Sequence, residues 1–399
     1  MNLLQREYPI IVHSHLGWDW VWQRPQQFMS RLSQRHAVLF IEGPLPEENL
    51  DESRLEARPA ADYPNVIVVR MRMPGAKWFD GDWVDNERRR LVQELLAGPL
   101  GASFQEPIQW FYDPMAVTAF AGHMNEQAIV FDCMDQLSQF KGAPDVLVKR
   151  ERHLLEVADI VFAGGPKLGA EKRKFNANTF VYGCGVDADH FGKAMDPTIQ
   201  RPVDVANLPK PILGFFGVID ERMDYALLAE LVDAFSTGSI VLIGPWTKVD
   251  PAHFPQRPNL HYLDKRSYDQ LPNYAAVFDV CLLPFALNPA TEFVNPTKVL
   301  EYLATGRPVI STAIADVMLQ FSEFVKIAHS HTEFVEQCQN VCRCSDLAVR
   351  KLALEVARRN TWEQVVENLE RHIWDVLSSR TAARSSASPS GQALPMIAG

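Results

Sequence analysis

Residues 295–310 read NPTKVLEYLATGRPVI, and this stretch decides the fold that we predict. Asn295 is a good helix cap, Pro296 suits the first helical position because no N–H is needed there, and Gly306 favours a left-handed helix end. A short apolar strand follows the helix, and another apolar run at residues 278–285 precedes the loop. Strand, loop, helix and strand in this order form a βαβ crossover, and open α/β sheets bind ligands at such a loop.

Lys298 and Glu301 lie three residues apart, so they share one face near the start of this predicted helix. The first turn of a helix also offers free N–H groups and a positive dipole end to an anion. A cation for a phosphate and a carboxylate for a sugar hydroxyl would suit a nucleotide sugar. The pattern alone equally fits an ordinary helix start with a solvated Lys–Glu pair.

The composition indicates a globular protein of two domains. The chain has 399 residues, of which 47% are hydrophobic and 22% charged. A net charge of −10 argues against a nucleic-acid binder, which would usually be basic. No run of 18 apolar residues occurs, and residues 1–9 lack a hydrophobic signal core, so we expect a cytoplasmic protein.

The opening stretch resembles the donor-binding segment of retaining GT-B glycosyltransferases of the family-four class, in the bacterial form PxKxxEYLAxGxPVxST. Residues 22–32, WQRPQQFMSRL, resemble the first loop and helix of the same enzymes, and residues 185–191 resemble the GVDxxxF signature at their domain junction. The resemblance implies an α/β fold of two Rossmann-like domains that face a central cleft. It also implies a C-terminal helix that crosses back to the N-terminal domain.

The resemblance and the composition together predict the domain limits. Residues 1–195 form an N-terminal acceptor domain, and the proline-containing residues 196–209 form a linker. Residues 210–360 form the donor domain, and residues 361–377 form the helix that packs on the N-terminal domain. Residues 378–399 are rich in Ser, Ala and Pro, and we expect a disordered tail there.

The resemblance assigns the donor site to the C-terminal half. It implies that Lys298 binds the diphosphate and that Glu301 holds the ribose hydroxyls. Donor-site candidates beside them are Gly217, which follows a strand at residues 211–216, and the loop residues Asn295 and Thr297.

The sequence departs from the family at the phosphate clamp. Many members carry a closely spaced arginine and lysine after the glycine, whereas this chain has only Arg222 in reach, with Lys248 after the next strand. The family often has two glutamates eight residues apart, and the nearest acid upstream of Glu301 is Glu292, one residue out of register. We therefore give Glu292 no role at the sugar.

Asp132 and Asp135 are our candidates for acidic groups near the reacting sugar. They follow a predicted strand at residues 127–131 in the segment DCMDQLSQF. The resemblance implies that a polar residue at this strand end reaches the donor sugar. Capping of the next helix is an equally good interpretation of both aspartates.

The first predicted strand spans residues 8–12, and the tryptophan-rich loop that follows it supplies the acceptor candidates. The resemblance implies that this loop faces the cleft, and packing of the aromatic residues under the loop is the alternative. The candidates for the acceptor side of the cleft are Gly17, Trp18, Gln23 and Arg24.

We expect no metal site. Asp80-Gly81-Asp82 is a DxD triplet, but three residues are weak evidence and we interpret them as a turn. Cys338, Cys342 and Cys344 cluster near two histidines without paired CxxC spacing, which favours reduced thiols on a helix.

We therefore predict a metal-independent hexosyltransferase of surface polysaccharide or glycolipid synthesis. It would move a sugar from a UDP- or GDP-linked donor, with retention and without a cofactor, to a saccharide or lipid-linked acceptor. Trp20, Trp22, Trp78 and Phe79 are candidates for peripheral contact with the inner face of the membrane. Two alternatives stay open: a nucleotide-sugar epimerase of the same fold, and a non-catalytic scaffold that binds the nucleotide sugar.

Overall fold

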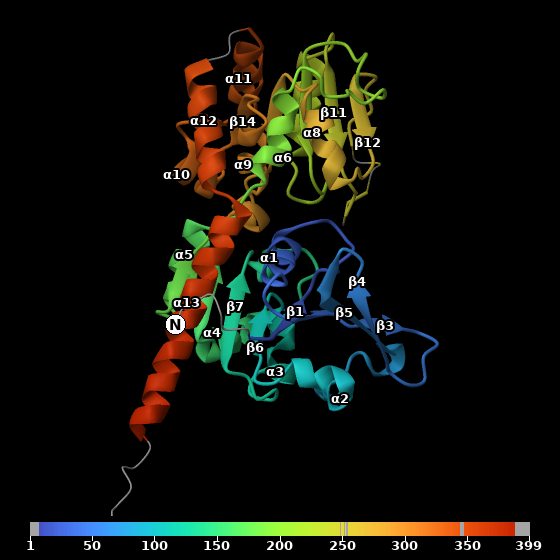
Figure 1. Ribbon diagram of the computed structural model, residues 1–399. Coiled ribbons are helices and arrows are strands. Elements are labelled where there is room, and N and C mark those ends of the chain that lie inside the picture. Colours follow the sequence, from blue (N-terminus) through green and yellow to red (C-terminus); the bar gives the residue numbers. More distant parts are fainter. Residues whose placement is uncertain (1–7, 248, 251, 253, 344–346, 388–399) are drawn as a thin grey trace, which may run out of the picture.

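The computed structural model describes residues 8–247, 249–250, 252, 254–343 and 347–387. These residues form two α/β domains, one above the other in Figure 1, and each is built around its own sheet. None of the helices in the described part of the chain combines the length and the apolar character needed to cross a bilayer.

The N-terminal sheet has nine strands. Their order is β3-β5-β2-β1-β6-β7-β8-β9, and β4 pairs with β5 as the antiparallel member. The predicted strands 8–12 and 127–131 are present as β1 and β7, whereas β3 and β4 were not predicted. The strands are β1 Ile10–Ser14, β2 Val38–Glu42, β3 Leu45–Glu47, β4 Arg54–Ala60, β5 Tyr63–Pro74, β6 Ile108–Phe111, β7 Ala128–Cys133, β8 Ile160–Ala163 and β9 Thr179–Val181.

Helices cover both faces of this sheet, which explains why its central strands are apolar on both sides. One face packs against α1 and the C-terminal helix α13, and the other against α2, α3 and α4. The helices of this domain are α1 Arg24–Leu32, α2 Gly81–Ala97, α3 Val117–Phe120, α4 Val146–Val157 and α5 Pro166–Arg173. Asp80 caps α2 by accepting a hydrogen bond from the Trp83 N–H at 3.0 Å, so the DxD triplet forms a helix start rather than the predicted turn.

The C-terminal sheet has six parallel strands in the order β12-β11-β10-β13-β14-β15. The chain reverses direction across the sheet between β10 and β13, which is the point where doubly wound sheets bind ligands. The strands are β10 Ile212–Phe216, β11 Ser239–Ile243, β12 Leu260–Leu263, β13 Val280–Leu283, β14 Val309–Thr312 and β15 Lys326–Ala328. The helices are α6 Ala188–Gly192, α7 Tyr225–Ala234, α8 Leu271–Ala275, α9 Lys298–Ala304, α10 Ala315–Phe321, α11 His331–Arg343 and α12 Leu347–Arg359.

The last helix, α13 Trp362–Ala387, returns to the N-terminal domain. In Figure 1 it is the long red helix that runs down beside the lower domain. It extends ten residues beyond the predicted end at 377, so residues 378–387 of the predicted tail are part of the helix. Residues 388–399 lie outside the described part of the chain.

Buried polar contacts hold α13 against the N-terminal domain. Glu370 is 6% exposed and contacts both Arg35 and the Nε2 of His36. Burial and the neighbouring Arg35 lower the pKa of His36 to about 4, so this ring is neutral. Its Nδ1 accepts a hydrogen bond from the Tyr8 N–H, which leaves Nε2–H to donate to Glu370.

We expect Glu370→Ala to destabilise the protein by about 2–3 kcal/mol, because it leaves buried donors without their charged acceptor. Thermal unfolding followed by circular dichroism measures this change. The matched control is Glu363→Ala on the same helix, since the Glu363 side chain is 59% exposed where it meets Arg31. An exposed pair contributes at most about 1 kcal/mol, so equal effects of the two substitutions would contradict the proposed docking of α13.

Candidate active site

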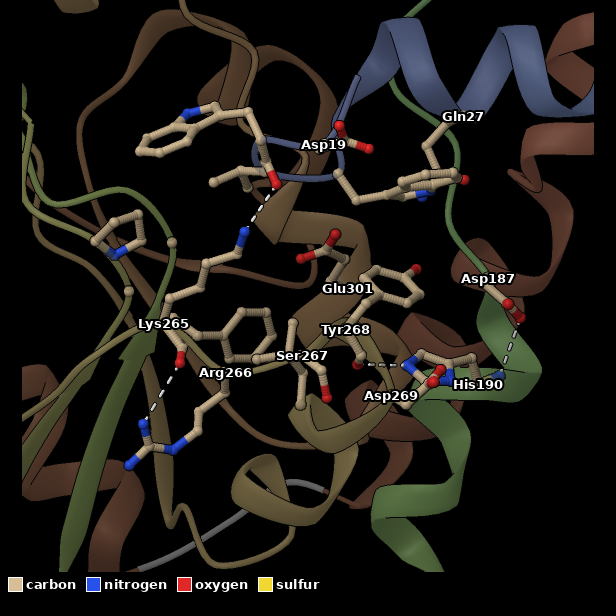
Figure 2. A pocket seen from close by; sticks show the side chains of 18 of the residues that line it. Asp19, Gln27, Asp187, His190, Lys265, Arg266, Ser267, Tyr268, Asp269 and Glu301 are labelled. Carbon is tan, nitrogen blue, oxygen red and sulfur yellow. Dashed lines mark hydrogen bonds between the residues drawn. The ribbon is translucent and has the colours of Figure 1, made fainter. Parts of the chain in front are cut away.

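A cavity of ≈ 680 Å³ lies between the two domains. The N-terminal domain contributes the tryptophan loop before α1 and the turn before β5, and the C-terminal domain contributes the ends of β10 and β11, the loop after β12 and the first turn of α9. Figure 2 shows side chains from both domains converging on this space. A smaller cavity of ≈ 120 Å³ shares Gly217, Lys298 and Glu301 with it and reaches Asp135 and Arg24.

Lys298 and Glu301 both line the cavity, and the expectation that they share a helix face is met. Lys298 Nζ lies 2.9 Å from Glu301 Oε2 and 5.6 Å from the centre of the Phe216 ring. Glu301 is 5% exposed. The Tyr302 hydroxyl accepts a hydrogen bond from the Phe216 N–H at 3.0 Å, so the helix that carries the pair is fixed to the end of β10.

The start of α9 differs from the prediction. The helix has seven residues and begins at Lys298, so Pro296 precedes it and Asn295 does not cap it. The Asn295 side chain instead donates to the Gly164 carbonyl at 2.9 Å, and the Thr297 hydroxyl donates to Cys184 Sγ at 3.0 Å. Both side chains therefore connect the donor domain to the N-terminal domain, although both residues line the smaller cavity. Gly306, with φ of 67°, ends the helix in the left-handed conformation as predicted.

Two glycines allow the ends of β10 and β11 to meet at the cavity. Gly217 has φ of 154° and Gly244 has φ of 144°. A Cβ on Gly244 would lie 1.8 Å from the Gly217 carbonyl oxygen, so a side chain cannot be accommodated there. A Cβ on Gly217 would come within 3.3 Å of the Lys298 side chain, at the edge of the space that a ligand would occupy.

The predicted phosphate-clamp residue Arg222 is held by a neighbouring carboxylate. Its Nη2 lies 2.7 Å from Asp220 Oδ2, and its Nε also donates to Asp220 at 2.9 Å. The guanidinium carbon is 5.8 Å from the Phe140 ring centre, across the domain boundary. Arg222 therefore enters the smaller cavity as an oriented, charge-compensated group. Lys248, the other clamp candidate, lies outside the described residues.

Asp132, which we predicted as a catalytic group, lines neither of the two cavities and is paired with Arg24 instead. It is fully buried at the end of β7, and its Oδ1 accepts a hydrogen bond from Arg24 Nε at 2.9 Å. Arg24 is 2% exposed, and its Nη1 also donates to the carbonyls of Tyr182 and Gly183. Asp132 thus fixes Arg24, and Arg24 rather than Asp132 lines the smaller cavity.

Asp135 is the aspartate that reaches the cleft. It is partly exposed and lines the smaller cavity with Arg24 and Arg222. Burial raises the pKa of Asp135 to about 6, against the opposing effect of the two nearby guanidinium groups. A carboxylate with this pKa can exchange a proton near neutral pH, which is the property expected of a group that assists proton transfer.

The predicted acceptor-side residues lie in different places in the structure. Trp18 lines the large cavity and packs edge-on against Trp22 and Tyr63. Gln23 and Arg24 line the smaller cavity instead. Gly17 lines neither of these two cavities and supports the loop through its carbonyl, which accepts from Gln26 Nε2 at 2.9 Å.

Several cavity residues carried no signal in the sequence. Tyr63 stacks on Trp22 with ring centres 5.7 Å apart, and Lys265 Nζ donates to the Trp20 carbonyl at 2.8 Å across the cleft. Tyr268 lies below that contact, next to Glu301 in Figure 2. These residues sit in connecting segments without a motif, so only the proximity created by the fold reveals them.

The comparisons with solved structures cover both domains of the chain. The chain is similar to sucrose-phosphate synthase from Thermosynechococcus elongatus, with a TM-score of 0.70, 15% identity, and coverage of 93% of this chain and 100% of that one. An E. coli structure described as trehalose-6-phosphate bound with UDP-2-fluoro glucose gives a TM-score of 0.63, 15% identity, and coverage of 92% and 99%. The chain has the GT-B fold. The sequence prediction of two Rossmann-like domains facing a cleft is therefore confirmed.

Two further comparisons extend this GT-B assignment. The catalytic domain of starch synthase IV from Arabidopsis thaliana, bound to ADP and acarbose, gives a TM-score of 0.62 at 12% identity and covers 93% of this chain and 99% of that one. Among curated proteins, the putative teichuronic acid biosynthesis glycosyltransferase TuaH of Bacillus subtilis is 21% identical over 168 residues. That match spans 40% of this chain and 42% of TuaH. No family model matches the chain.

The two aspartates should respond differently to neutralisation. We expect Asp132→Asn to destabilise the protein by about 3–5 kcal/mol, because it leaves the buried Arg24 charge uncompensated. Asp135→Asn should lower stability less, since Asp135 is partly exposed, whereas Asp132 is fully buried against the Arg24 guanidinium. Thermal unfolding of both variants tests this contrast, and a larger loss for Asp135→Asn would reverse our assignment of the two roles.

Proposed function

We propose that this protein is a glycosyltransferase that uses a nucleoside diphosphate sugar as donor. The observation that carries the proposal is the Lys298–Glu301 pair, which lines a ≈ 680 Å³ cavity between two Rossmann-like domains of a GT-B fold. The names of the similar proteins support it, because TuaH is described as a putative glycosyltransferase and the E. coli structure is described as bound with UDP-2-fluoro glucose.

Lys298 is the proposed partner of the donor diphosphate, which gains negative charge as the sugar leaves. A fixed cation beside the leaving group stabilises that charge where water is excluded. The sharp turn at Gly217 leaves room for the phosphates beside Lys298. Arg222, oriented by Asp220, adds a second cation at the smaller cavity. Glu301 accepts hydrogen bonds from the ribose, and UDP and GDP are the donor nucleotides to test first.

The proposed acceptor is a saccharide, free or lipid-linked. Trp18, Trp22 and Tyr63 form an aromatic wall opposite the donor residues, and the apolar faces of sugar rings pack against such walls. Asp62 and Gln27 line the same side of the cavity and could bond sugar hydroxyls. The name of TuaH, a putative teichuronic acid biosynthesis glycosyltransferase, supports a role in surface polysaccharide synthesis. Contact with the inner face of the membrane stays a proposal of the sequence analysis.

The proposed reaction is a metal-independent transfer of a hexosyl group with retention. The bond between the anomeric carbon and the donor phosphate breaks, and a new glycosidic bond to the acceptor oxygen forms on the same face of the sugar. The leaving phosphate takes the acceptor proton. Asp135, together with Arg24 and Arg222, positions the transferred sugar in the smaller cavity.

One observation favours a second candidate, a scaffold that binds the nucleotide sugar without transfer. Arg222, the arginine that follows the turn at Gly217, is compensated by Asp220. Such a protein would bind the donor, but it would neither transfer the sugar nor slowly hydrolyse the donor. A GT-B epimerase would instead convert the donor to a second nucleotide sugar when no acceptor is present. Product analysis with and without acceptor separates the three activities.

The first prediction is nucleotide binding that depends on Lys298 and Glu301. A ligand at 100 times its dissociation constant stabilises the folded state by about 2.7 kcal/mol, which a thermal shift detects. We expect one of UDP, GDP or ADP to give this shift, and Lys298→Ala and Glu301→Ala to remove it. Glu323→Ala and Lys326→Ala are the controls, because both side chains are exposed and absent from the cavity lining. No shift with any nucleotide or nucleotide sugar would overturn the proposal.

The second prediction concerns pH. The pKa of Asp135 is raised to about 6, so its carboxylate is ionised above this pH and protonated below it. If the ionised form positions the sugar, the rate of transfer falls as pH drops through about 6. Asp135→Asn should lower the rate and abolish this acidic limb. If Asp135→Asn shows the same fall in rate below about pH 6, Asp135 has no role in the mechanism.

A further inference from the structure

Two buried oxygen atoms in the large cavity lack hydrogen-bond partners among the described residues. They are the hydroxyl oxygen of Tyr268 and Oε2 of Glu301. Lys298 Nζ lies 2.9 Å from Glu301 Oε2 and forms an ion pair with it, but the angles at the two atoms do not satisfy a hydrogen bond. The Gln27 amide approaches Tyr268 from the other domain, also without hydrogen-bond geometry. A buried polar atom without a hydrogen-bond partner is unfavourable, so a ligand that hydrogen-bonds to both atoms would gain affinity.

The ring of Tyr268 is held in place from below. His190 stacks on it with ring centres 4.6 Å apart and planes 8° apart. The Nε2 of His190 lies 3.0 Å from the Tyr268 carbonyl oxygen, and the His190 N–H donates to Asp187 at 3.0 Å. Figure 2 shows this chain of contacts from Asp187 through His190 to Tyr268, with Glu301 beside the phenol. The hydroxyl group of Tyr268 is thus presented to the cavity by a ring that is packed on its other side.

The chemistry of the two groups is complementary. Burial raises the pKa of Tyr268, and the carboxylates of Glu301 and Asp187 raise it further, so the phenol stays protonated and can donate. An ionised Glu301 can only accept. A donor and an acceptor side by side match two adjacent hydroxyl groups, of which one accepts from the phenol and the other donates to the carboxylate.

We propose that Tyr268 and Glu301 together bind the vicinal diol of the donor ribose, with Tyr268 donating to one hydroxyl and Glu301 accepting from the other. The inference rests on the proposed function and adds Tyr268 as a specificity-determining residue. His190 is a positioning residue, since it stacks on the Tyr268 ring. The pair selects ribonucleotides, because a deoxynucleotide leaves one of the two buried groups unpaired.

The experiment removes the Tyr268 hydroxyl from the protein and, separately, the 2′- or 3′-hydroxyl from the nucleotide. Isothermal titration calorimetry measures binding of UDP and GDP, and of their 2′-deoxy and 3′-deoxy forms, to the full chain and to Tyr268→Phe. Phenylalanine keeps the stack on His190. Tyr274→Phe is the matched control, because the Tyr274 hydroxyl bonds Arg266 and Asp204 and that residue does not line the cavity.

We expect the unmodified protein to bind the ribonucleotide about ten times more tightly than one of its deoxy forms, which corresponds to about 1.4 kcal/mol. Tyr268→Phe should lose most of that preference by weakening ribonucleotide binding alone, and Tyr274→Phe should keep it. The preference is a ratio measured on one protein preparation, so a modest loss of stability does not obscure it.

The outcomes separate the two proposals. Nucleotide binding that is unchanged in Tyr268→Phe, with the full preference for ribose, overturns the role of Tyr268 and leaves the proposed function intact. Absence of binding by the unmodified protein overturns both. A preference that disappears in Glu301→Gln but persists in Tyr268→Phe assigns the ribose to Glu301 alone and also overturns the inference.

Discussion

The buried pair of Arg24 and Asp132 is the interaction on which the cleft depends. Its charges come from the start of α1 and the end of β7, and the same guanidinium bonds two carbonyls after β9. Three segments that are far apart in the sequence therefore meet beneath the site. A buried ion pair contributes little net stability, but loss of one partner is strongly unfavourable. The pair thus acts mainly as a geometric constraint on where these segments end.

The contacts between the domains explain how the cleft keeps its shape. Asn295 bonds the Gly164 carbonyl, and Lys265 bonds the Trp20 carbonyl at another edge of the large cavity. Asp135 and Arg222 face each other from different domains within the smaller cavity. The chemistry that we propose needs groups from both domains, so a change in the angle between the domains would separate them. The long helix α13 continues the chain from the end of the donor domain and packs on α1, β7 and β8 of the N-terminal domain.

Much of the donor side was readable from the sequence because its residues are close together along the chain. Lys298 and Glu301 share a helix face through their spacing, and Gly217 follows a buried strand, so local rules place them. The same rules misplaced the start of α9: Asn295 has the character of a cap, yet a carbonyl of the other domain claims its side chain. Asp132 and Asp135 looked alike in sequence, and only burial separated a structural carboxylate from one that reaches the cleft.

The sequence by itself determined the alternation of strands and helices, the two-domain GT-B arrangement and the helix face that carries Lys298 and Glu301. The alternation and the helix face follow from hydrophobic periodicity and residue spacing, which are local properties of the chain. The GT-B arrangement was implied by the resemblance of its motifs to those of GT-B glycosyltransferases. The tertiary structure alone decided that Tyr268, Tyr63 and Lys265 share one cavity, and that Asp220 compensates Arg222. Those relations depend on distances between segments that the chain brings together only on folding, and no local pattern encodes them.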